Sequence, residues 1–530
     1  MNSLTQSVPT LFRRTRWVTV AFFAIGILAA YKIAGYIIVS DYGSLLFSAL
    51  IFLVCVFVVA LVQNWRKGVY FFLGWLLFED LARKFLGNNM VVYFAKDLLV
   101  LLIYLSFFAA YRRKNQDLQT FRPPFLAAML IFVWYGAMQA FNPASTSIFY
   151  GLLGMKLYFY YMPLIVVGYA MINSEAELRK FFYINLGLII VIAALGIIQS
   201  IAGPRFLNPE VIADDIRLLS ETYRVAPISG ARVYRPTSVF VSAGRFADLL
   251  IVGWILVFGF SGYLLLRHRR GRIFAFLGLT VLAAACVMSS SRGVFMWSAG
   301  SAVVGAVAFV WGAPWRQGEV LRVLRTLQRA ILGIILAGVV MLVTYPGAFL
   351  DRLAVYSETL SPSSPASELV NRTRDYPLRN FLAAFDYPRW PYGYGIGTLS
   401  LGGQYVARFF HARPVIGSVE SGFGAIVVEM GIGGLILWFI MAAAILISAW
   451  RVVRRLKGSP WFPLAFMIFF YAFLLFVPLT YEGLQPYQDF ILNAYVWLLL
   501  GVLFRLPTLA PSVQFAASAR PYEPDSRRIR

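Results

Sequence analysis

Arginines near the ends of apolar runs are the residues of this sequence best suited to chemistry. Arg235 and Arg245 lie in RPTSVFVSAGRFADLL, and Arg292 lies in the short connection SSSRG. A guanidinium group is planar, stays charged at any reasonable pH and binds phosphate oxygens in bidentate fashion. Two or three such groups could hold a diphosphate and stabilise it as a leaving group without a metal ion. The pattern therefore predicts an anion site for a phosphorylated lipid.

A second arginine group follows in RTRDYPLRN, which contains Arg372, Arg374 and Arg379. Any one arginine at a helix end can simply reach toward lipid headgroups. However, ionisable groups at membrane depth are candidates for function, and the tight turn around Arg292 restrains that side chain. We therefore predict that Arg292 and Arg235 act on the diphosphate. Arg245, Arg372 and Arg379 are predicted to bind substrate.

The apolar segment VESGFGAIVVEMGIGG, residues 419–434, contains two acids, Glu420 and Glu429. Glu420 stands at the start of an apolar helix, where the helix dipole and nearby arginines favour its carboxylate. It could accept a proton from a sugar hydroxyl or orient that hydroxyl. Alternatively, Glu420 only complements the helix dipole. Glu429 is expected to pair with a buried cation in a structural role.

Three further charges fall inside predicted spans: Lys96, Asp97 and Lys156. Lys96 and Asp97 are adjacent, so they face different directions on a helix, and each needs a partner on another helix. A structural ion pair within the membrane is the favoured interpretation. A role for Lys156 in binding substrate is the alternative.

The composition requires a membrane to accommodate these elements. The 530 residues are 60% hydrophobic, 17% aromatic and only 13% charged, which a soluble domain could not bury. The net charge of +23 is arranged in short basic clusters between apolar runs, as expected of cytoplasmic loops and not of a nucleic-acid-binding surface. Cys55 and Cys286 form no disulfide or metal motif, and no metal-binding or nucleotide-binding motif is evident.

Apolar segments long enough to cross a bilayer recur along the chain. The predicted spans are 17–38, 44–63, 69–86, 91–110, 124–141, 153–173, 181–203, 245–266, 273–290, 294–312, 330–347, 421–448, 461–480 and 487–505. The least certain is 69–86, whose charged second half could form an interfacial turn. The fold class is therefore an all-α polytopic membrane protein with about 12–14 transmembrane helices.

Basic clusters follow every second predicted span, which gives one consistent orientation with both termini in the cytoplasm. The first span is expected to be a retained helix and not a cleaved signal. Segments 204–244 and 348–420 then fall on the outer side, and the second is expected to contain short helices. The domains are 1–347 with its outer loop, the large loop 348–420, the helices 421–505 and a cytoplasmic tail 506–530.

An ordered set of weak motifs resembles the O-antigen ligase and O-antigen polymerase (Wzy-type) superfamily of bacterial membrane glycosyltransferases. The motifs are KDLLVLL at 96–102, RPTSVF at 235–240, SSSRG at 289–293, the P-x-G-x-G-x-G pattern at 391–397 and GIGG at 431–434. The resemblance covers residues from about 90 to 450 and rests on the order and sidedness of the motifs. It implies a GT-C-like architecture with a periplasmic loop in the bacterial inner membrane.

The resemblance also implies a mechanism without cofactors. Arg292 and Arg235 would bind the diphosphate of a polyprenyl-linked glycan, and Glu420 would activate the attacking hydroxyl in a single inverting displacement. Partners would be the lipid-linked oligosaccharide, the bilayer and a chain-length regulator or other assembly proteins, with no nucleic acid. The loop would contact sugars through Arg379, Trp390 and Tyr392.

One position departs from the ligase pattern. Counting back from the glycines at 431–434 places Glu420 where the ligases have a histidine, and His411 does not match the spacing. This difference suits a polymerase-like branch of the superfamily better than a ligase. The ligase remains an alternative, as does a lipid-linked oligosaccharide flippase or exporter; a scaffold has no positive signal in the sequence.

Overall fold

The computed structural model describes residues 58–61, 63–112, 121–209, 214–268, 271–314, 317–400, 402–411, 419–477 and 487–509. The predicted span 17–38, most of 44–63 and the tail 510–530 lie outside the described residues. The elements are α3 Trp65–Phe85, α4 Met90–Arg112, α5 Leu126–Gln139, α6 Ile148–Phe159, α7 Leu164–Met171, α8 Glu175–Ala202, α9 Asp214–Ser220, β1 Tyr223–Val225, β2 Arg232–Tyr234, α10 Ala243–Arg267, α11 Arg272–Met288, α12 Arg292–Gly312, α13 Gln317–Thr344, α14 Pro346–Leu360, a π-helical turn Asn371–Asp375, α15 Tyr376–Ala383, a 3-10 turn Ala384–Asp386, α16 Gly403–Phe410, α17 Gly422–Arg455, α18 Phe462–Phe476 and α19 Phe490–Leu509.

The chain is all-α apart from one small hairpin, and every predicted span from 69–86 onward contains a helix. Within the described ranges, seven helices are long and apolar enough to cross a membrane, or eight if the bent pair 331–344 and 346–360 is one span. Shorter apolar helices are α5, α11 and α18. These helices indicate a multi-pass membrane protein, since a helix satisfies its own backbone hydrogen bonds in lipid.

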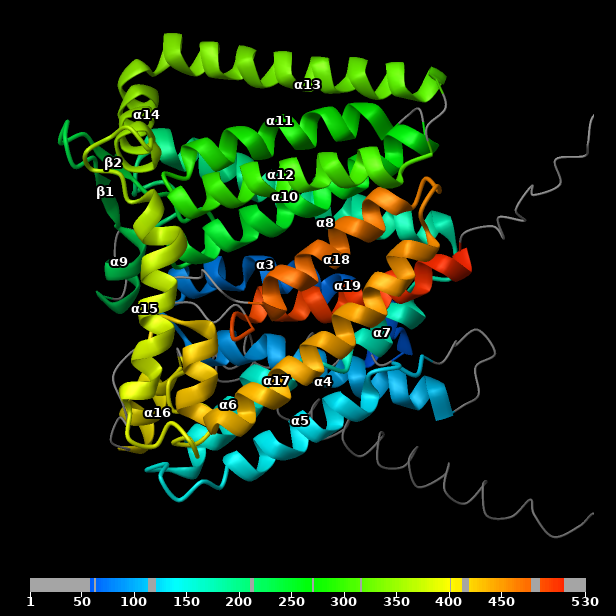
Figure 1. The fold of residues 1–530 in the computed structure, drawn as a ribbon, viewed down its shortest axis with the longest axis vertical. Helices are drawn as coiled ribbons and strands as arrows, with labels where there is room; N and C mark the ends of the chain where they lie inside the picture. Colours follow the sequence, from blue (N-terminus) through cyan, green and yellow to red (C-terminus); the bar gives the residue numbers. More distant parts are fainter. Residues whose placement is uncertain are drawn as a thin grey trace, which may run out of the picture.

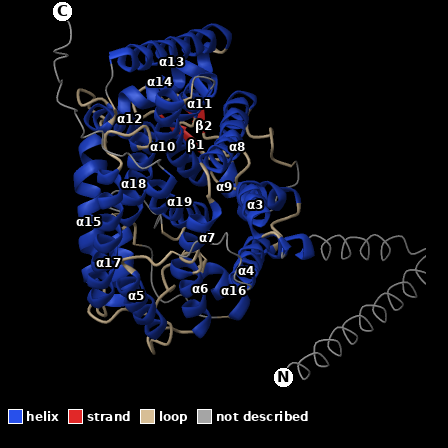
Figure 2. Cartoon of the chain, turned by 90° about the vertical axis from the view of Figure 1, so that its right-hand side faces the viewer, coloured by secondary structure: helices blue, strands red, loops and turns tan. Residues whose placement is uncertain are grey.

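The helices run roughly along one direction and enclose a continuous apolar core (Figure 1). In the most apolar 18-residue stretch of α19, 89% is buried, and this helix passes through the middle of the bundle (Figure 2). By contrast, only 28% of the most apolar 18-residue stretch of α12 is buried. The remaining apolar surface of α12 suits contact with lipid, where exposed hydrophobic side chains carry no penalty.

The two segments predicted to share one side of the membrane do lie at the same end of the bundle (Figure 1). One supplies α9 and the β1–β2 hairpin, and the other supplies α14, α15 and α16. Glu358 of α14 joins them, because its Oε2 accepts a hydrogen bond from the backbone N–H of Ile228 at 2.6 Å. Ala226, Val233 and Val355 form a small apolar cluster between them.

The charged half of α3 is helical and buried, so the alternative of an interfacial turn at the end of span 69–86 is wrong. Glu79, Asp80, Arg83 and Lys84 all lie inside the protein. Lys96 of α4 pairs with Glu79 at 2.9 Å, and both side chains are fully buried. Pairing removes the cost of isolated charges in an apolar interior, which explains why this polar stretch stays within the bundle.

Candidate functional site

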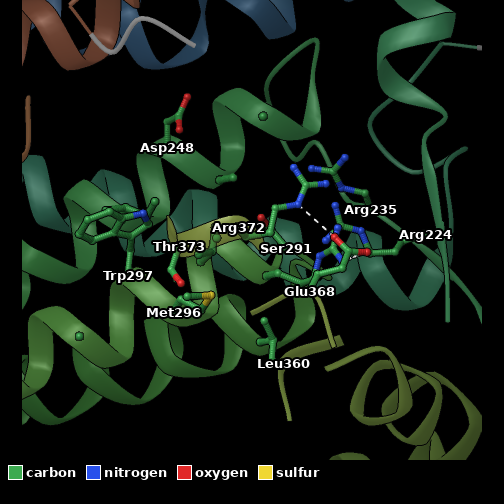
Figure 3. Close-up of a pocket in the computed structure, with 17 residues that line it drawn as sticks. Arg224, Arg235, Asp248, Ser291, Met296, Trp297, Leu360, Glu368, Arg372 and Thr373 are labelled. Atoms are coloured by element: carbon green, nitrogen blue, oxygen red, sulfur yellow. Dashed lines mark hydrogen bonds and ion pairs between the residues drawn. The ribbon is translucent and has the colours of Figure 1, made fainter. Parts of the chain in front are cut away.

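A cavity of about 540 Å³ lies among the hairpin, the amino ends of α10 and α12, and residues 360–373. Four arginines line it: Arg224, Arg235, Arg292 and Arg372. Its carboxylates are Glu368 and Asp248. Figure 3 shows Arg224, Arg235 and Arg372 gathered near Glu368, with Asp248 and Trp297 toward the other side. The four arginines outnumber the two carboxylates, so the cavity attracts anions.

The hairpin positions two of these arginines. Strands β1 and β2 are antiparallel, with Arg224 opposite Val233. The pairing continues past β2, where the N–H of Arg235 donates to the carbonyl of Thr222 at 3.0 Å. Arg352 of α14 is buried, and its Nη2 donates to the carbonyl of Tyr234 at 3.4 Å. Backbone pairing and this contact from α14 together fix the hairpin that presents Arg224 and Arg235.

The SSSRG turn positions Arg292. Ser289 ends α11, and Ser290 adopts the left-handed conformation with φ of 56°. The buried Ser290 hydroxyl donates to the carbonyl of Tyr234 at 3.2 Å, which ties this turn to the hairpin. Arg292 is therefore the first residue of α12, at a helix end whose unpaired N–H groups also favour anions.

Glu368 neutralises only part of this charge. Its carboxylate accepts from Arg292 Nη1 at 2.7 Å and from Arg372 Nε at 3.0 Å. Partial burial alone would raise the pKa of Glu368, but the hydrogen bonds from these two arginines lower it below its usual value. Glu368 is thus a carboxylate held in its charged form by the arginines that it bridges.

Arg224 and Arg235 have no carboxylate partner within the described part of the chain, and the buried Nε of Arg235 has no hydrogen-bond acceptor. Burial and then the charge of Arg292 lower the pKa of both guanidinium groups, and Arg235 contributes further to lowering that of Arg224. Both remain cationic near neutral pH, because guanidinium is such a weak acid. Three arginine charges are crowded here and the Glu368 carboxylate offsets only part of them, so an anion would stabilise the site.

The cavity also has an apolar part. Ala247 and Ile251 of α10 face Val294, Met296 and Trp297 of α12 across it, while Leu360 closes it from the end of α14. A ligand with a charged head and an apolar or sugar-bearing portion would find matching surfaces for both.

Three of the predicted arginines, Arg235, Arg292 and Arg372, line this cavity, whereas Arg245 does not. Both oxygens of Asp80 accept from Arg245 Nη1, at 2.8 and 2.7 Å. Lys156 likewise pairs with Asp97 at 2.5 Å, outside the cavity. The requirement that Lys96 and Asp97 find partners on other helices is therefore confirmed.

The predicted sugar-binding side chains also lie outside the cavity. Arg379 is exposed, and its guanidinium carbon is 5.8 Å from the centre of the Tyr376 ring. Trp390 packs edge-on against Phe385, and Tyr392 is 77% exposed. Their assignment to sugar binding stays a prediction.

Glu420 is exposed and is not among the residues that line the cavity, so the expectation that it shares a hollow with Arg235 and Arg292 is wrong. It directly precedes Ser421, whose hydroxyl caps α17 by accepting from the N–H of Gly424 at 3.1 Å. This position suits the alternative interpretation, in which Glu420 complements the dipole of the helix.

Glu429 does not pair with a buried cation, contrary to expectation. Its carboxylate accepts from the Tyr158 hydroxyl at 2.7 Å and from the N–H of Leu399 at 2.9 Å. The contact with Leu399 joins α17 to the P-x-G-x-G-x-G segment. A structural role is the one these neutral donors support.

The two glycine motifs are packed against each other. At Gly431, φ is 72° and α17 is kinked, and a Cβ there would lie 2.5 Å from the carbonyl oxygen of Pro391. Gly397 has φ of 89°, and a Cβ there would lie 2.1 Å from the carbonyl oxygen of Tyr150. Only glycine fits these close backbone contacts. The motifs therefore join the large loop to the helices and do not themselves line the arginine cavity.

Comparison with protein-family models finds no match for the chain, and comparison with curated proteins finds none either.

Sequence reasoning missed Arg224, Glu368 and Asp248. Asp248 had a detectable signal, since it is an acid inside the apolar span predicted at 245–266. Arg224 and Glu368 had none, because their proximity to Arg292 depends on the strand register and on how the large loop folds back.

Proposed function

We propose that the protein is a membrane glycosyltransferase that polymerises or transfers a polyprenyl-diphosphate-linked oligosaccharide at the periplasmic face of the inner membrane. The observation that supports this most directly is the cavity in which Arg224, Arg235, Arg292 and Arg372 converge at one end of a bundle of apolar helices. A lipid carrier resting in the bilayer would present its diphosphate at this height.

The arginines would bind the diphosphate and favour its departure. As the bond from the anomeric carbon to the diphosphate breaks, negative charge accumulates on the leaving oxygen. Fixed cations placed where this charge develops stabilise it more than they stabilise the bound substrate, which lowers the barrier. Arg235 suits this role especially, because its buried Nε has no hydrogen-bond acceptor among the described residues.

Glu368 would set the arrangement of the site before the donor arrives. It holds Arg292 and Arg372 together, and a diphosphate oxygen would compete with its carboxylate for the same donors. Trp297 supplies an aromatic face beside the charged region, on which a sugar ring or an isoprene unit could pack.

The test is chain extension by purified protein in detergent, with lipid-linked oligosaccharide extracted from a strain of the source organism that lacks this protein. We expect longer glycans on the lipid with wild type and little or no extension with Arg292→Ala. Arg374→Ala is the matched control, because Arg374 belongs to the same loop as Arg372 but is 76% exposed and lies outside the cavity.

A transporter would give a different result, since detergent leaves no compartments between which to move a substrate. Absence of any glycan transfer by wild type, to lipid-linked or other acceptors, would overturn the proposal. Glycan analysis of the deletion strain separates the two transferase types: single repeat units left on lipid indicate a polymerase, and long unattached chains indicate a ligase.

A further inference from the structure

Asp248 is a buried acid in the wall of the arginine cavity, and one oxygen of its carboxylate has no hydrogen-bond partner. It lies near the start of α10, is 6% exposed and lines the cavity. Its Oδ2 is buried and has no hydrogen-bond donor. Buried polar atoms are nearly always hydrogen-bonded, and an acid inside an apolar span is costly, so this exception requires an explanation.

The neighbouring charges do not satisfy Asp248. Arg245, one turn earlier on α10, is engaged by Asp80 through both carboxylate oxygens. Asp489 is near enough for its charge to act on Asp248, but it adds repulsion and itself accepts from the N–H groups of Ile491 and Leu492. Arg245 attracts Asp248 by its charge, but its hydrogen bonds go to Asp80, and Asp248 Oδ2 has no donor among the described residues.

Glu368, the other carboxylate of the cavity, is poorly suited to accept a proton. Glu368 is bridged by Arg292 and Arg372, which lower its pKa. A carboxylate so strongly stabilised in its charged form is a weak base. Glu420 is exposed and does not line the cavity, so the structure does not place it beside the arginines.

We propose that Asp248 is the catalytic base that orients the acceptor sugar hydroxyl and takes its proton. This role rests on the proposed function. In Figure 3 Asp248 and Trp297 lie away from the gathered arginines, so a donor with its diphosphate on the arginines leaves the Asp248 side for the acceptor.

The proposed reaction is a single displacement at the anomeric carbon. The acceptor hydroxyl oxygen forms a bond to the anomeric carbon while the bond from that carbon to the diphosphate oxygen breaks. The electron pair of the broken bond leaves with the diphosphate, and the hydroxyl proton moves to Asp248. The product is a longer glycan and a free polyprenyl diphosphate, and Asp248 later releases its proton to water.

The test compares Asp248→Asn with wild type, using Asp375→Asn as the control because Asp375 is 53% exposed and lies outside the cavity. Turnover is measured with lipid-linked oligosaccharide from the deletion strain, and binding is measured separately with polyprenyl diphosphate. Removing a general base while leaving the arginines intact is expected to lower kcat about 10²–10⁴-fold. The Kd for polyprenyl diphosphate should stay within about threefold of wild type, since the amide has the same shape.

Asp248→Glu provides a second variant. It keeps a carboxylate, so we expect more turnover than with Asp248→Asn. If Asp248 were only structural, the Glu variant would have no advantage in turnover over the Asn variant. Turnover of Asp248→Asn within about tenfold of wild type, or loss of polyprenyl diphosphate binding in that variant, would overturn the role of Asp248. An inactive wild type that also fails to bind polyprenyl diphosphate would instead overturn the proposed function.

Discussion

Replacing Glu368 by glutamine should make the cavity bind pyrophosphate more tightly. In the structure the Glu368 carboxylate competes with any incoming anion, because it accepts from Arg292 at 2.7 Å and from Arg372 at 3.0 Å. The Glu368→Gln variant keeps the shape of the side chain but removes its charge. All four cavity arginines then act on the anion with one less opposing carboxylate.

The magnitude follows from Coulomb's law and the exposure of the groups. Two unit charges about 4 Å apart interact by about 1 kcal/mol in water and by about 4 kcal/mol at an effective dielectric constant of about 20. The side chains of Arg292, Glu368 and Arg372 are 15%, 36% and 31% exposed, so solvent screens the interaction strongly. We therefore expect a gain of about 1–2 kcal/mol, or about 5- to 30-fold in Kd.

Isothermal titration of the detergent-solubilised protein with inorganic pyrophosphate measures this change. The difference between wild type and Glu368→Gln should shrink between about 0.1 M and 1 M salt, as the Debye length falls from about 10 Å to about 3 Å. Glu358→Gln is the control, because Glu358 accepts from the backbone at Ile228 and Ser229 and does not line the cavity. Unchanged or weaker binding by Glu368→Gln would refute the idea that Glu368 competes with the ligand.

Three further predictions concern residues outside the cavity. Arg245→Ala should lower the free energy of unfolding by about 1.5–3 kcal/mol, because the buried Asp80 carboxylate loses the two hydrogen bonds from Arg245 and keeps its ion pair with Arg83; an unchanged denaturant midpoint would contradict this. Gly397→Ala should lower the free energy of unfolding by about 2–4 kcal/mol, since its φ is left-handed and a Cβ would strike a backbone carbonyl. Gly187→Ala has open space around it and should lower that free energy little; thermal unfolding compares the two variants. Glu420→Gln should extend glycans within about twofold of wild type, as expected for an exposed side chain; a large loss of rate would return Glu420 to the site.

Hydropathy was sufficient to locate the helices but not to explain their polar positions. The charged half of α3 resembles an interfacial turn in sequence, because nearby residues do not supply an opposite charge for each of its acids and bases. Only Arg83 and Asp80 pair within the helix; the other partners are Lys96 on α4 for Glu79 and Arg245 on α10, 165 residues away, as a second cation for Asp80. Such pairings depend on which helices are adjacent, and a single sequence does not encode that in any local pattern.

The cavity was predictable only in part. Arg235 and Arg292 could be found because both stand at helix ends on the same predicted side of the membrane. Arg245 has the same sequence signature but is neutralised by Asp80, so sidedness alone does not separate a free arginine from a paired one. The glycine motifs suggested proximity to a ligand, whereas the left-handed conformations of Gly397 and Gly431 serve the packing of the large loop against α17.

The most direct test of the arginine cavity as a lipid-diphosphate site is photo-crosslinking. A polyprenyl diphosphate with a photoreactive group on its first isoprene unit is bound to the purified protein, irradiated and mapped by mass spectrometry. We expect labelling within residues 291–300 and 244–251, its suppression by excess inorganic pyrophosphate, and its loss in the double variant Arg235→Ala/Arg292→Ala. Labelling confined to other helices, or equal labelling of wild type and the double variant, would contradict the assignment.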